Sequence, residues 1–315
     1  MNQSDPSRQG LQPRRTTAEA IPLASTTSGQ SSALQPDPTT IVFATDGTAA
    51  SAAARAAAAQ LARSSKAALH VVYVSVPSTA PGGGHPAADE AVAKAIAAAE
   101  ARTLEEESGS PVAGVHTPHE WRVEGILRVA YRVGAGLVVV GGRRITILEE
   151  FFTYRVSEGV AHRSLLPLLV VPEDSPEWPP RHIVVGYDGS PEARRASHLA
   201  EWIARLSDAD VRLVRVLEPS SSPTARREAE LRLNGAAAYM GTRLSSDRVS
   251  AQVVTSSDVA GVLREACAAA EGTMLAIGAR GIGPLRRAQH ASVSETLDHH
   301  SRIPLVLAPP AGPER

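Results

Sequence analysis

The sequence contains one cysteine, Cys267, among its 315 residues. A single thiol forms neither an intrachain disulfide nor a four-cysteine metal site, and this scarcity is typical of proteins kept in a reducing compartment. Because Cys267 lies in an alanine-rich helical run, we expect it to be a small core residue rather than a reactive thiol.

Long apolar runs are also lacking. No stretch approaches the roughly 18 apolar residues that a membrane-spanning helix needs. Residues 1–10 carry no basic patch leading into an apolar block, as a secretory signal would. The sequence therefore predicts a soluble, cytoplasmic protein with no membrane partner.

Neither sign of charge dominates, and aromatic residues are few. The chain has 32 Lys and Arg against 33 Asp and Glu, so nothing favours nucleic-acid binding through bulk electrostatics. Trp121, Trp178 and Trp202 are scattered and form no base-stacking platform. We predict no nucleic-acid partner.

Patterns that carry catalysis or bind metals are missing as well. No Ser/His/Asp or Cys/His arrangement stands out, and no pair of carboxylates is placed for acid–base chemistry. The tripeptide at 298–300, Asp-His-His, falls late in a predicted helix, where a solvated helix end explains it better than a metal site. We predict no catalytic residues and no metal ligands.

The sequence does contain an internal repeat, in which one pattern of residues occurs twice. The run Ile41–Thr48, an apolar strand followed by Asp-Gly-Thr and a helix, returns as Ile183–Ser190. Three further markers recur in the same order at nearly the same spacing, which indicates a duplicated domain. They are Leu137–Arg143 with Met274–Arg280, Val156–Glu158 with Val293–Glu295, and Leu165–Val171 with Arg302–Ala308.

Composition changes mark the boundaries of the two copies. Residues 1–38 are rich in Ser, Thr, Gln and Pro and predict a disordered tail. The prolines of 173–180 block helix formation and predict a short, stiff linker. The copies themselves are predicted at 39–172 and 181–310, followed by a terminal tail at 311–315.

Strands and helices alternate in both copies. Continuous apolar runs such as Ile183–Gly186 are typical of buried parallel strands, and Ser190 with Pro191 predicts a helix start. The predicted fold class is α/β: two tandem doubly wound domains, each with a five-stranded, mostly parallel sheet between helices. Strands are expected at 41–45, 68–75, 111–117, 137–140 and 168–171, then at 183–186, 211–217, 249–255, 274–277 and 305–308.

The strongest candidate site follows the fourth strand of the second copy. It reads Gly278-Ala-Arg-Gly281, then nine residues, then Ala291-Ser292 at the start of a predicted helix. Small residues after a strand allow backbone N–H groups to approach phosphates, and a helix N-terminus adds partial positive charge. The spacing is neither that of a P-loop nor that of a dinucleotide-binding fingerprint.

This combination of strand, Asp-Gly-Ser turn and spaced glycine loop resembles the universal stress protein family in its tandem, two-domain form. The resemblance implies an adenine nucleotide alpha hydrolase-like fold and ATP binding, with Mg²⁺ as an accompanying ion. It also implies that the last strands of the two domains, Leu168–Val171 and Leu305–Ala308, pair within one chain as a pseudo-dimer, with a homodimer as a further possibility.

Carried over to this sequence, the resemblance implies a nucleoside contact at Tyr187 and Asp188. It implies a backbone contact to adenine at Val216 and packing near the base by Ile277. Around the phosphates it places Gly278, Gly281, Ser292 and Val293. Arg280 could neutralise phosphate charge, and Ala291 stands at the position of a family glycine beside the phosphates.

Both copies depart from the family's loop. Ala291 replaces a glycine in the second copy; strain there of roughly 1 kcal/mol would weaken binding several-fold without abolishing it. In the first copy Arg144, Tyr154 and Arg155 occupy the loop positions that phosphates need. Asp46 remains, but an Asp before Gly is also an ordinary turn device.

The leading interpretation is a non-catalytic, ATP-binding stress-response protein that binds chiefly through its second domain. One alternative is a nucleotide-free protein-interaction module. Another is a slow ATPase in which Asp188 holds Mg²⁺, although neither loop supplies a general base or a second acidic ligand.

Overall fold

The computed structural model describes residues 37–75, 86–120, 122–142, 166–175, 178–278 and 303–309. The helix predicted to start at Ala291-Ser292 lies outside the described residues, as do the predicted terminal tails apart from residues 37 and 38. None of the described helices is long and apolar enough to cross a membrane.

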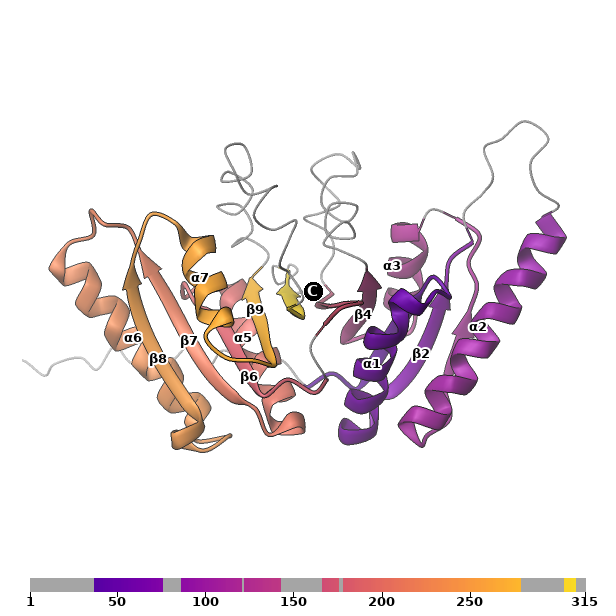
Figure 1. The fold of residues 1–315 in the computed structure, drawn as a ribbon, viewed down its shortest axis with the longest axis horizontal. Helices are drawn as coiled ribbons and strands as arrows, with labels where there is room; N and C mark the ends of the chain where they lie inside the picture. Colours follow the sequence, from indigo (N-terminus) through magenta and orange to yellow (C-terminus); the bar gives the residue numbers. More distant parts are fainter. Residues whose placement is uncertain are drawn as a thin grey trace, which may run out of the picture. The chain divides into compact units, whose positions relative to one another are not determined.

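The predicted alternation of strands and helices is confirmed in both copies (Figure 1). The first repeat contains β1 (Thr40–Thr45), the 3-10 turn η1 (Ala49–Ser51), α1 (Ala52–Ser65), β2 (Ala68–Tyr73), α2 (Pro86–Ser108), β3 (Gly114–His116), α3 (Arg122–Arg132), β4 (Leu137–Gly142) and β5 (Leu168–Pro172). The second contains β6 (His182–Gly186), α5 (Pro191–Ser207), β7 (Asp210–Leu217), α6 (Pro223–Gly241), the 3-10 turn η2 (Ser246–Arg248), β8 (Val249–Thr255), α7 (Val259–Ala268), β9 (Thr273–Gly278) and β10 (Leu305–Ala308).

Strand β3 is shorter than the stretch 111–117 predicted for it. Pro111 has no backbone N–H and cannot donate to β2, whereas the N–H of Ala113 donates to Leu69 O of β2 over 2.7 Å. The paired residues of this ladder therefore begin with His70 opposite Gly114.

The strands form one ten-stranded sheet in the order β3-β2-β1-β4-β5-β10-β9-β6-β7-β8. Every neighbouring pair is parallel except β5 and β10, which are antiparallel with Leu169 opposite Val306. The two repeats therefore join through their last strands, which confirms the predicted pairing within one chain.

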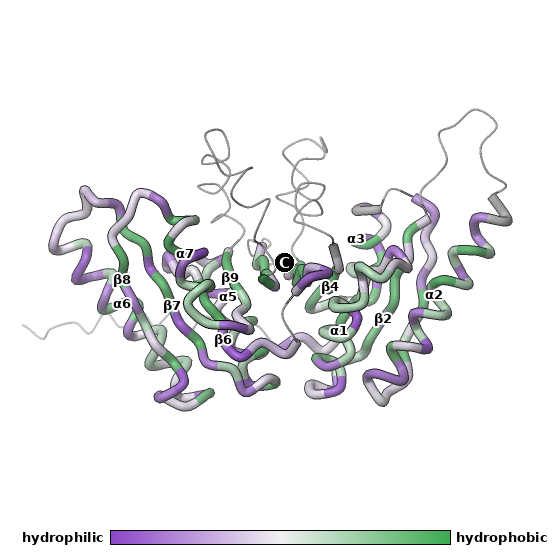
Figure 2. The backbone as a smooth tube through the Cα atoms, viewed as in Figure 1, coloured by the Kyte–Doolittle hydropathy of each residue, from purple (hydrophilic) through white to green (hydrophobic). Residues whose placement is uncertain are grey.

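Helices cover both faces of this sheet. One core cluster packs α1, α2, α5 and α6 on one face, and the other packs α3 and α7 on the opposite face. The strands are predominantly hydrophobic while the helices alternate along their length (Figure 2), because each helix buries only a stripe of its surface. Helix α5 begins as the sequence predicts: the Ser190 side chain accepts a hydrogen bond from Ala193 N, and Pro191 follows the cap.

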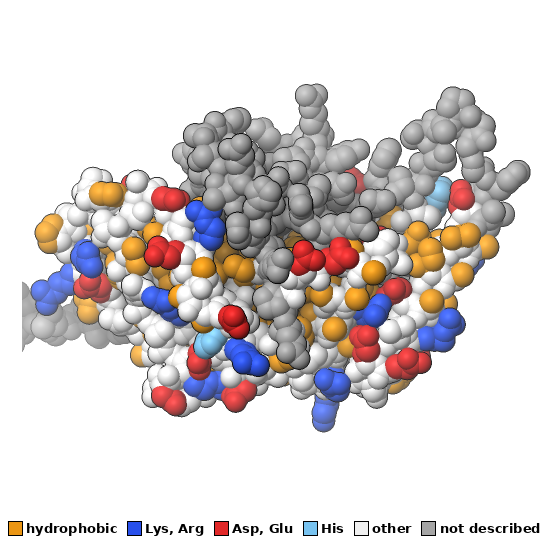
Figure 3. Space-filling model, in the orientation of Figure 1, with side chains coloured by type: hydrophobic (Ala, Val, Ile, Leu, Met, Phe, Trp, Pro, Cys, Tyr) orange, Lys and Arg blue, Asp and Glu red, His pale blue; other side chains and the backbone are white. Residues whose placement is uncertain are grey.

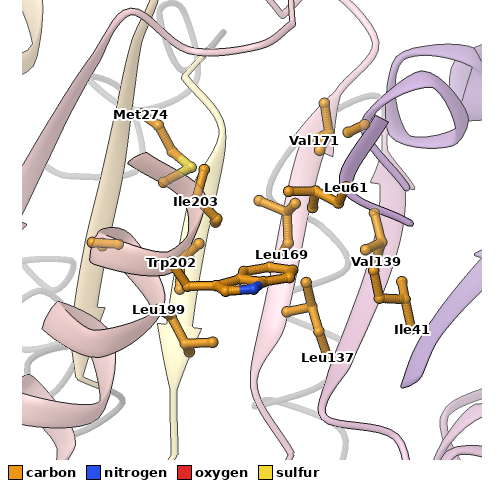
Figure 4. Close-up of a cluster of buried hydrophobic side chains, with 14 of the residues drawn as sticks. Ile41, Leu61, Leu137, Val139, Leu169, Val171, Leu199, Trp202, Ile203 and Met274 are labelled. Atoms are coloured by element: carbon orange, nitrogen blue, oxygen red, sulfur yellow. The ribbon is translucent and has the colours of Figure 1, made fainter. Parts of the chain in front are cut away.

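Side chains of the two repeats meet in the first of these cores. The indole of Trp202 on α5 is 2 % exposed and points toward Leu169 and Leu137 of the first repeat (Figure 4). Gln60 on α1 adds polar contacts, donating to the Leu206 carbonyl and accepting from the Trp178 indole N–H, each over 3.1 Å. The repeats thus share a core as well as a sheet.

Candidate functional site

The predicted ligand site lies where β9, β6 and β7 end, since these three strands are neighbours in the sheet. Carboxyl ends of parallel strands are where α/β sheets bind ligands. Tyr187 and Asp188 follow β6, Val216 is near the end of β7, and Ile277 and Gly278 end β9. The other predicted residues, Arg280, Gly281, Ala291, Ser292 and Val293, lie outside the described residues, as does the first-repeat loop at 143–165.

Asp188 is exposed at the rim of this edge. Its Oδ1 accepts the backbone N–H of Ser190 over 2.9 Å, and this is the one hydrogen bond that the described residues give its carboxylate. This turn holds the side chain beside the strand ends and leaves most of its acceptor capacity available.

The corresponding aspartate of the first repeat already accepts several hydrogen bonds from its own turn. Oδ1 of Asp46 accepts hydrogen bonds from Thr48 N (3.0 Å), Thr48 Oγ1 (2.7 Å) and Ser51 Oγ (2.9 Å). Burial opposes ionisation of Asp46, but these hydrogen bonds outweigh it and lower the pKa of the carboxyl below its ordinary value. Asp46 therefore acts as a turn and helix-start residue.

The backbone of Val216 faces the end of β6. Pairing between β6 and β7 stops at Gly186 and Val214, and Tyr187 N then donates to Val214 O over 2.9 Å. A residue in a parallel strand directs its N–H and C=O to the same side, and the residue two positions on repeats that direction. The N–H and C=O of Val216 therefore point past the last residue of β6, where a flat base could pair with them.

Tyr187 and Ile277 belong partly or wholly to the core. Tyr187 is half-buried, and this burial raises the pKa of its phenol, so the hydroxyl remains protonated at neutral pH. Ile277 is 4 % exposed and packs in the core that contains α7. The described contacts explain Ile277 by core packing without a ligand.

Gly278 is required by helix packing. A Cβ placed on it would lie 2.7 Å from the Cβ of Glu192 and 2.9 Å from Ala193 N, at the start of α5. Gly141 occupies the same position in the first repeat, where a Cβ would lie 2.9 Å from the Cα of Ser51. Because the degenerate repeat keeps its glycine for this reason, Gly278 alone does not indicate a phosphate site.

A cavity of about 210 Å³ opens beside Asp188, between the end of β7 and α6. The Arg215 side chain lines it, and its Nε and Nη1 atoms are shielded from solvent without a hydrogen-bond partner. Sequence reasoning missed Arg215. The available signal was its position in β7, because alternation places it on the same face as the buried residues Val211 and Leu213.

The described residues include no group of three or more His, Cys, Asp or Glu side chains that could hold a metal ion. Acidic and basic side chains are interspersed on the face shown in Figure 3. Any Mg²⁺ at the carboxyl edge of the second repeat would therefore need ligand oxygens from a bound phosphate in addition to Asp188.

The model of the universal stress protein family matches residues 38–172 and 180–309. No curated protein sequence matches significantly. Among solved structures, a universal stress protein from Archaeoglobus fulgidus DSM 4304 has a TM-score of 0.62 and 18 % identity, covering 87 % of this chain and 97 % of its own. A functionally unknown protein from Pseudomonas aeruginosa PAO1 has a TM-score of 0.50 and 15 % identity, with 87 % and 93 % coverage.

A third solved structure, a universal stress protein in complex with cAMP, is 23 % identical over 44 % of this chain and 99 % of its own, with a TM-score of 0.34. At these identities the first two structures support the fold alone. The third is too distant to support any statement about this chain.

Proposed function

Because this chain belongs to the universal stress protein family, we propose that it is a non-catalytic protein that binds an adenine nucleotide, ATP, in its second repeat. The site would lie at the carboxyl ends of β6, β7 and β9 and continue into the loop 279–292. The same proposal makes it a cytoplasmic protein of the stress response, in keeping with its single, buried thiol.

The difference between Asp188 and Asp46 carries this proposal. Both follow the first strand of a repeat and precede Gly, but Asp46 accepts three hydrogen bonds from its own turn while Asp188 accepts one. The three hydrogen bonds at Asp46 all fall on Oδ1 and hold it in its own turn, which leaves Oδ2 to accept from a ribose, whereas Asp188 gives only one bond to its turn and keeps more acceptor capacity for ribose hydroxyl groups. The second repeat is therefore the better nucleoside site.

The remaining contacts follow from the same edge. The N–H and C=O of Val216 point past β6 and match the donor and acceptor edge of adenine. Gly281, Ser292 and the backbone near them would hold the phosphates, as the loop spacing predicts. The phosphates of ATP, with Mg²⁺ bound to them, would carry negative charge that the guanidinium of Arg280 balances.

Nucleotide binding would act through stability rather than chemistry. A ligand that binds only the folded state adds a free energy of RT ln(1 + [L]/Kd), about 2.7 kcal/mol when the ligand is at a hundred times its Kd. Contacts between the bound phosphates and the loop at 279–292 would couple occupancy to the surface that the protein presents to a partner.

The decisive experiment identifies, by mass, any nucleotide released when freshly purified protein is denatured. We expect an adenine nucleotide in near-stoichiometric amount, lost in Asp188→Ala and Gly281→Arg and retained in Asp46→Ala. Asp46→Ala is the matched control because it makes the same change in the other repeat. An empty native protein that also gains no thermal stability from millimolar ATP would overturn the proposal.

A second candidate function is a nucleotide-free interaction module. The packing of Gly141 and Gly278 against helix starts favours it, since both glycines have a structural reason to persist without a ligand. The same experiment separates the two candidates, because the interaction module predicts an empty native chain. Hydrolysis is tested by phosphate release; release above that of Asp188→Ala would contradict the non-catalytic assignment.

A further inference from the structure

The cavity beside Asp188 is lined by Arg215, a partly buried residue with two shielded nitrogens that lack a partner among the described residues. Nε and Nη1 of Arg215 are both shielded from solvent, and none of the described side chains or carbonyls accepts a hydrogen bond from them. An arginine stays charged at any physiological pH. Shielding these two donors without an acceptor costs free energy, so they favour a ligand that supplies one.

In the first repeat, the position that corresponds to Arg215 carries an aromatic residue. Tyr73 stands in β2 where Arg215 stands in β7, because Ile41 pairs with Leu69 as Ile183 pairs with Val211. A Cβ placed on Gly47 would lie 2.5 Å from Ile96 of α2 and 3.7 Å from the Tyr73 ring. In the first repeat, apolar side chains therefore occupy the space beside the turn.

The second repeat leaves the same space open. A Cβ placed on Gly189, the counterpart of Gly47, would meet nothing within 4 Å. The cavity of about 210 Å³ lies there, between the β6 turn and α6. Duplication thus provides an internal comparison: one repeat is filled by Ile96 and Tyr73, and the other keeps a cavity lined by Arg215.

The lining of the cavity restricts the ligand. Arg215 lines it, Asp188 and Tyr187 stand at one side, and Glu228 and Arg232 of α6 form an ion pair of 3.6 Å. The formal charges of these groups cancel. Two carboxylates among them would repel a dianionic phosphate, whereas a monocarboxylate could use Arg215 and direct its own donor to Asp188.

We propose that this cavity binds a small amino or hydroxy acid, with its carboxylate on Arg215 and its ammonium or hydroxyl donor toward Asp188. The aliphatic side chains of Leu217 and Leu233 would contact the rest of the ligand. The volume suits a metabolite of a few heavy atoms, being smaller than the roughly 300 Å³ at which larger ligand pockets begin.

This site goes beyond the proposed nucleotide site. Arg215 and Leu217 face α6, whereas the side chains of Val216 and Ile277 pack in the core on the opposite face of the sheet. Asp188 stands at the edge between them. A nucleotide and a small acid would therefore use different residues apart from Asp188, and binding of each can be measured separately.

The test is calorimetric titration of the full chain with the standard α-amino acids, with the simplest α-hydroxy acids and with inorganic phosphate, each at millimolar concentration. We expect at least one amino or hydroxy acid to bind and phosphate not to bind. Arg215→Met should weaken that binding at least roughly tenfold, the loss expected for a charge-assisted hydrogen bond. Arg212→Met is the matched control, because Arg212 lies on the same strand, donates to Gln252 and faces the other side.

A second measurement needs no ligand. Removing these two shielded, unpartnered donors should raise the midpoint of thermal unfolding of Arg215→Met above that of the native chain, and Arg212→Met should not raise it. The proposal is overturned if no acid in the panel binds, if phosphate binds as well as the acids, or if Arg215→Met lowers the midpoint. Nucleotide release from the same variants is scored independently, so loss of ATP binding with acid binding intact would reject only the nucleotide site.

Discussion

Leu169 of β5 and Val306 of β10 lie opposite each other in antiparallel strands, and both side chains are fully buried. Each strand ends its own repeat and also pairs in parallel with a neighbour of that repeat. Either strand alone would be an exposed apolar edge, which invites aggregation. Because they pair, each repeat shields the apolar edge strand of the other, so the two repeats should unfold together.

Proline at position 306 tests this dependence. Strand β10 has a partner on both sides, so Val306→Pro removes a ladder hydrogen bond and introduces a steric clash. We expect the free energy of unfolding in urea to fall by about 3 kcal/mol or more, with earlier loss of both repeats. Val306→Ala is the control, because it removes buried methyl groups but keeps the N–H; a proline variant no worse than this control would contradict the shared-sheet account.

Most of the fold could be predicted from the sequence because local patterns determine it. Ile183–Gly186 is apolar throughout, and Ser190 with Pro191 marks a helix start in the sequence and in the structure. The short edge strand β3 was less predictable, because its pairing starts only where the Ala113 N–H donates to Leu69 O of β2. That contact joins residues on different elements and leaves no periodic signal.

The candidate site was harder to predict for the same reason. Sequence spacing points to Gly278 but cannot show that the N-terminus of α5 lies against it. Nor can it show that Ile96 fills the space beside Gly47 while the equivalent space beside Gly189 is open. Side-chain packing between elements decides whether the space at a strand end is filled or left as a cavity. Arg215 was overlooked because local sequence patterns do not show this packing.

Alanine at the two loop glycines separates packing from ligand binding. Gly141→Ala and Gly278→Ala each place a Cβ within 3 Å of the helix that follows the first strand of that repeat. We expect both to lower the free energy of unfolding by about 1–3 kcal/mol, as overpacking does. Gly235→Ala is the control: this exposed position within α6 has open space around it, and alanine should stabilise by about 0.5–1 kcal/mol. A Gly278→Ala variant of native stability that binds no nucleotide would instead assign this glycine to the ligand.

Two histidines form a chain of hydrogen bonds at the β2–β3 edge. Nη2 of Arg132 lies 3.1 Å from Nδ1 of His116, and Nε2 of His116 lies 3.2 Å from Nδ1 of His70. Arginine only donates, so Nδ1 of His116 must accept and its Nε2 must carry the proton given to His70. Protonating either ring breaks this chain.

Stability should consequently fall in mild acid. Burial lowers the pKa of His70 and of His116 below the ordinary 6.5, and the nearby charges of His70 and Arg132 lower that of His116 further. Because the unfolded chain then takes up protons first, these residues stabilise the fold above about pH 6.5, and the stabilisation is lost as the pH falls through their lowered pKa values. Urea unfolding at about pH 7 and about pH 5 measures the loss.

The second repeat supplies the variant for this test. Arg212 and Gln252 occupy the positions of His70 and His116, since His116 lies opposite Val72 as Gln252 lies opposite Val214. The double variant His70→Arg with His116→Gln should lose less stability between the two pH values than the native chain. His198 contributes equally to both proteins, so the difference isolates the pair; identical pH dependence would refute the assignment.

Cys267 should be inert while the protein is folded. It lies on α7 with 2 % of its surface exposed, and burial raises the pKa of its thiol to about 12. Since the thiolate is the reactive form, a thiol reagent at mildly alkaline pH should label the native chain only through opening of the α7 region and should label it fully in denaturant. The labelling rate then reports how often α7 leaves β6 and β9, the strands that it covers at the candidate site. Slower labelling with added ATP would mean that the nucleotide stabilises this face of the second repeat, whereas rapid labelling of the native chain would contradict the buried position of Cys267.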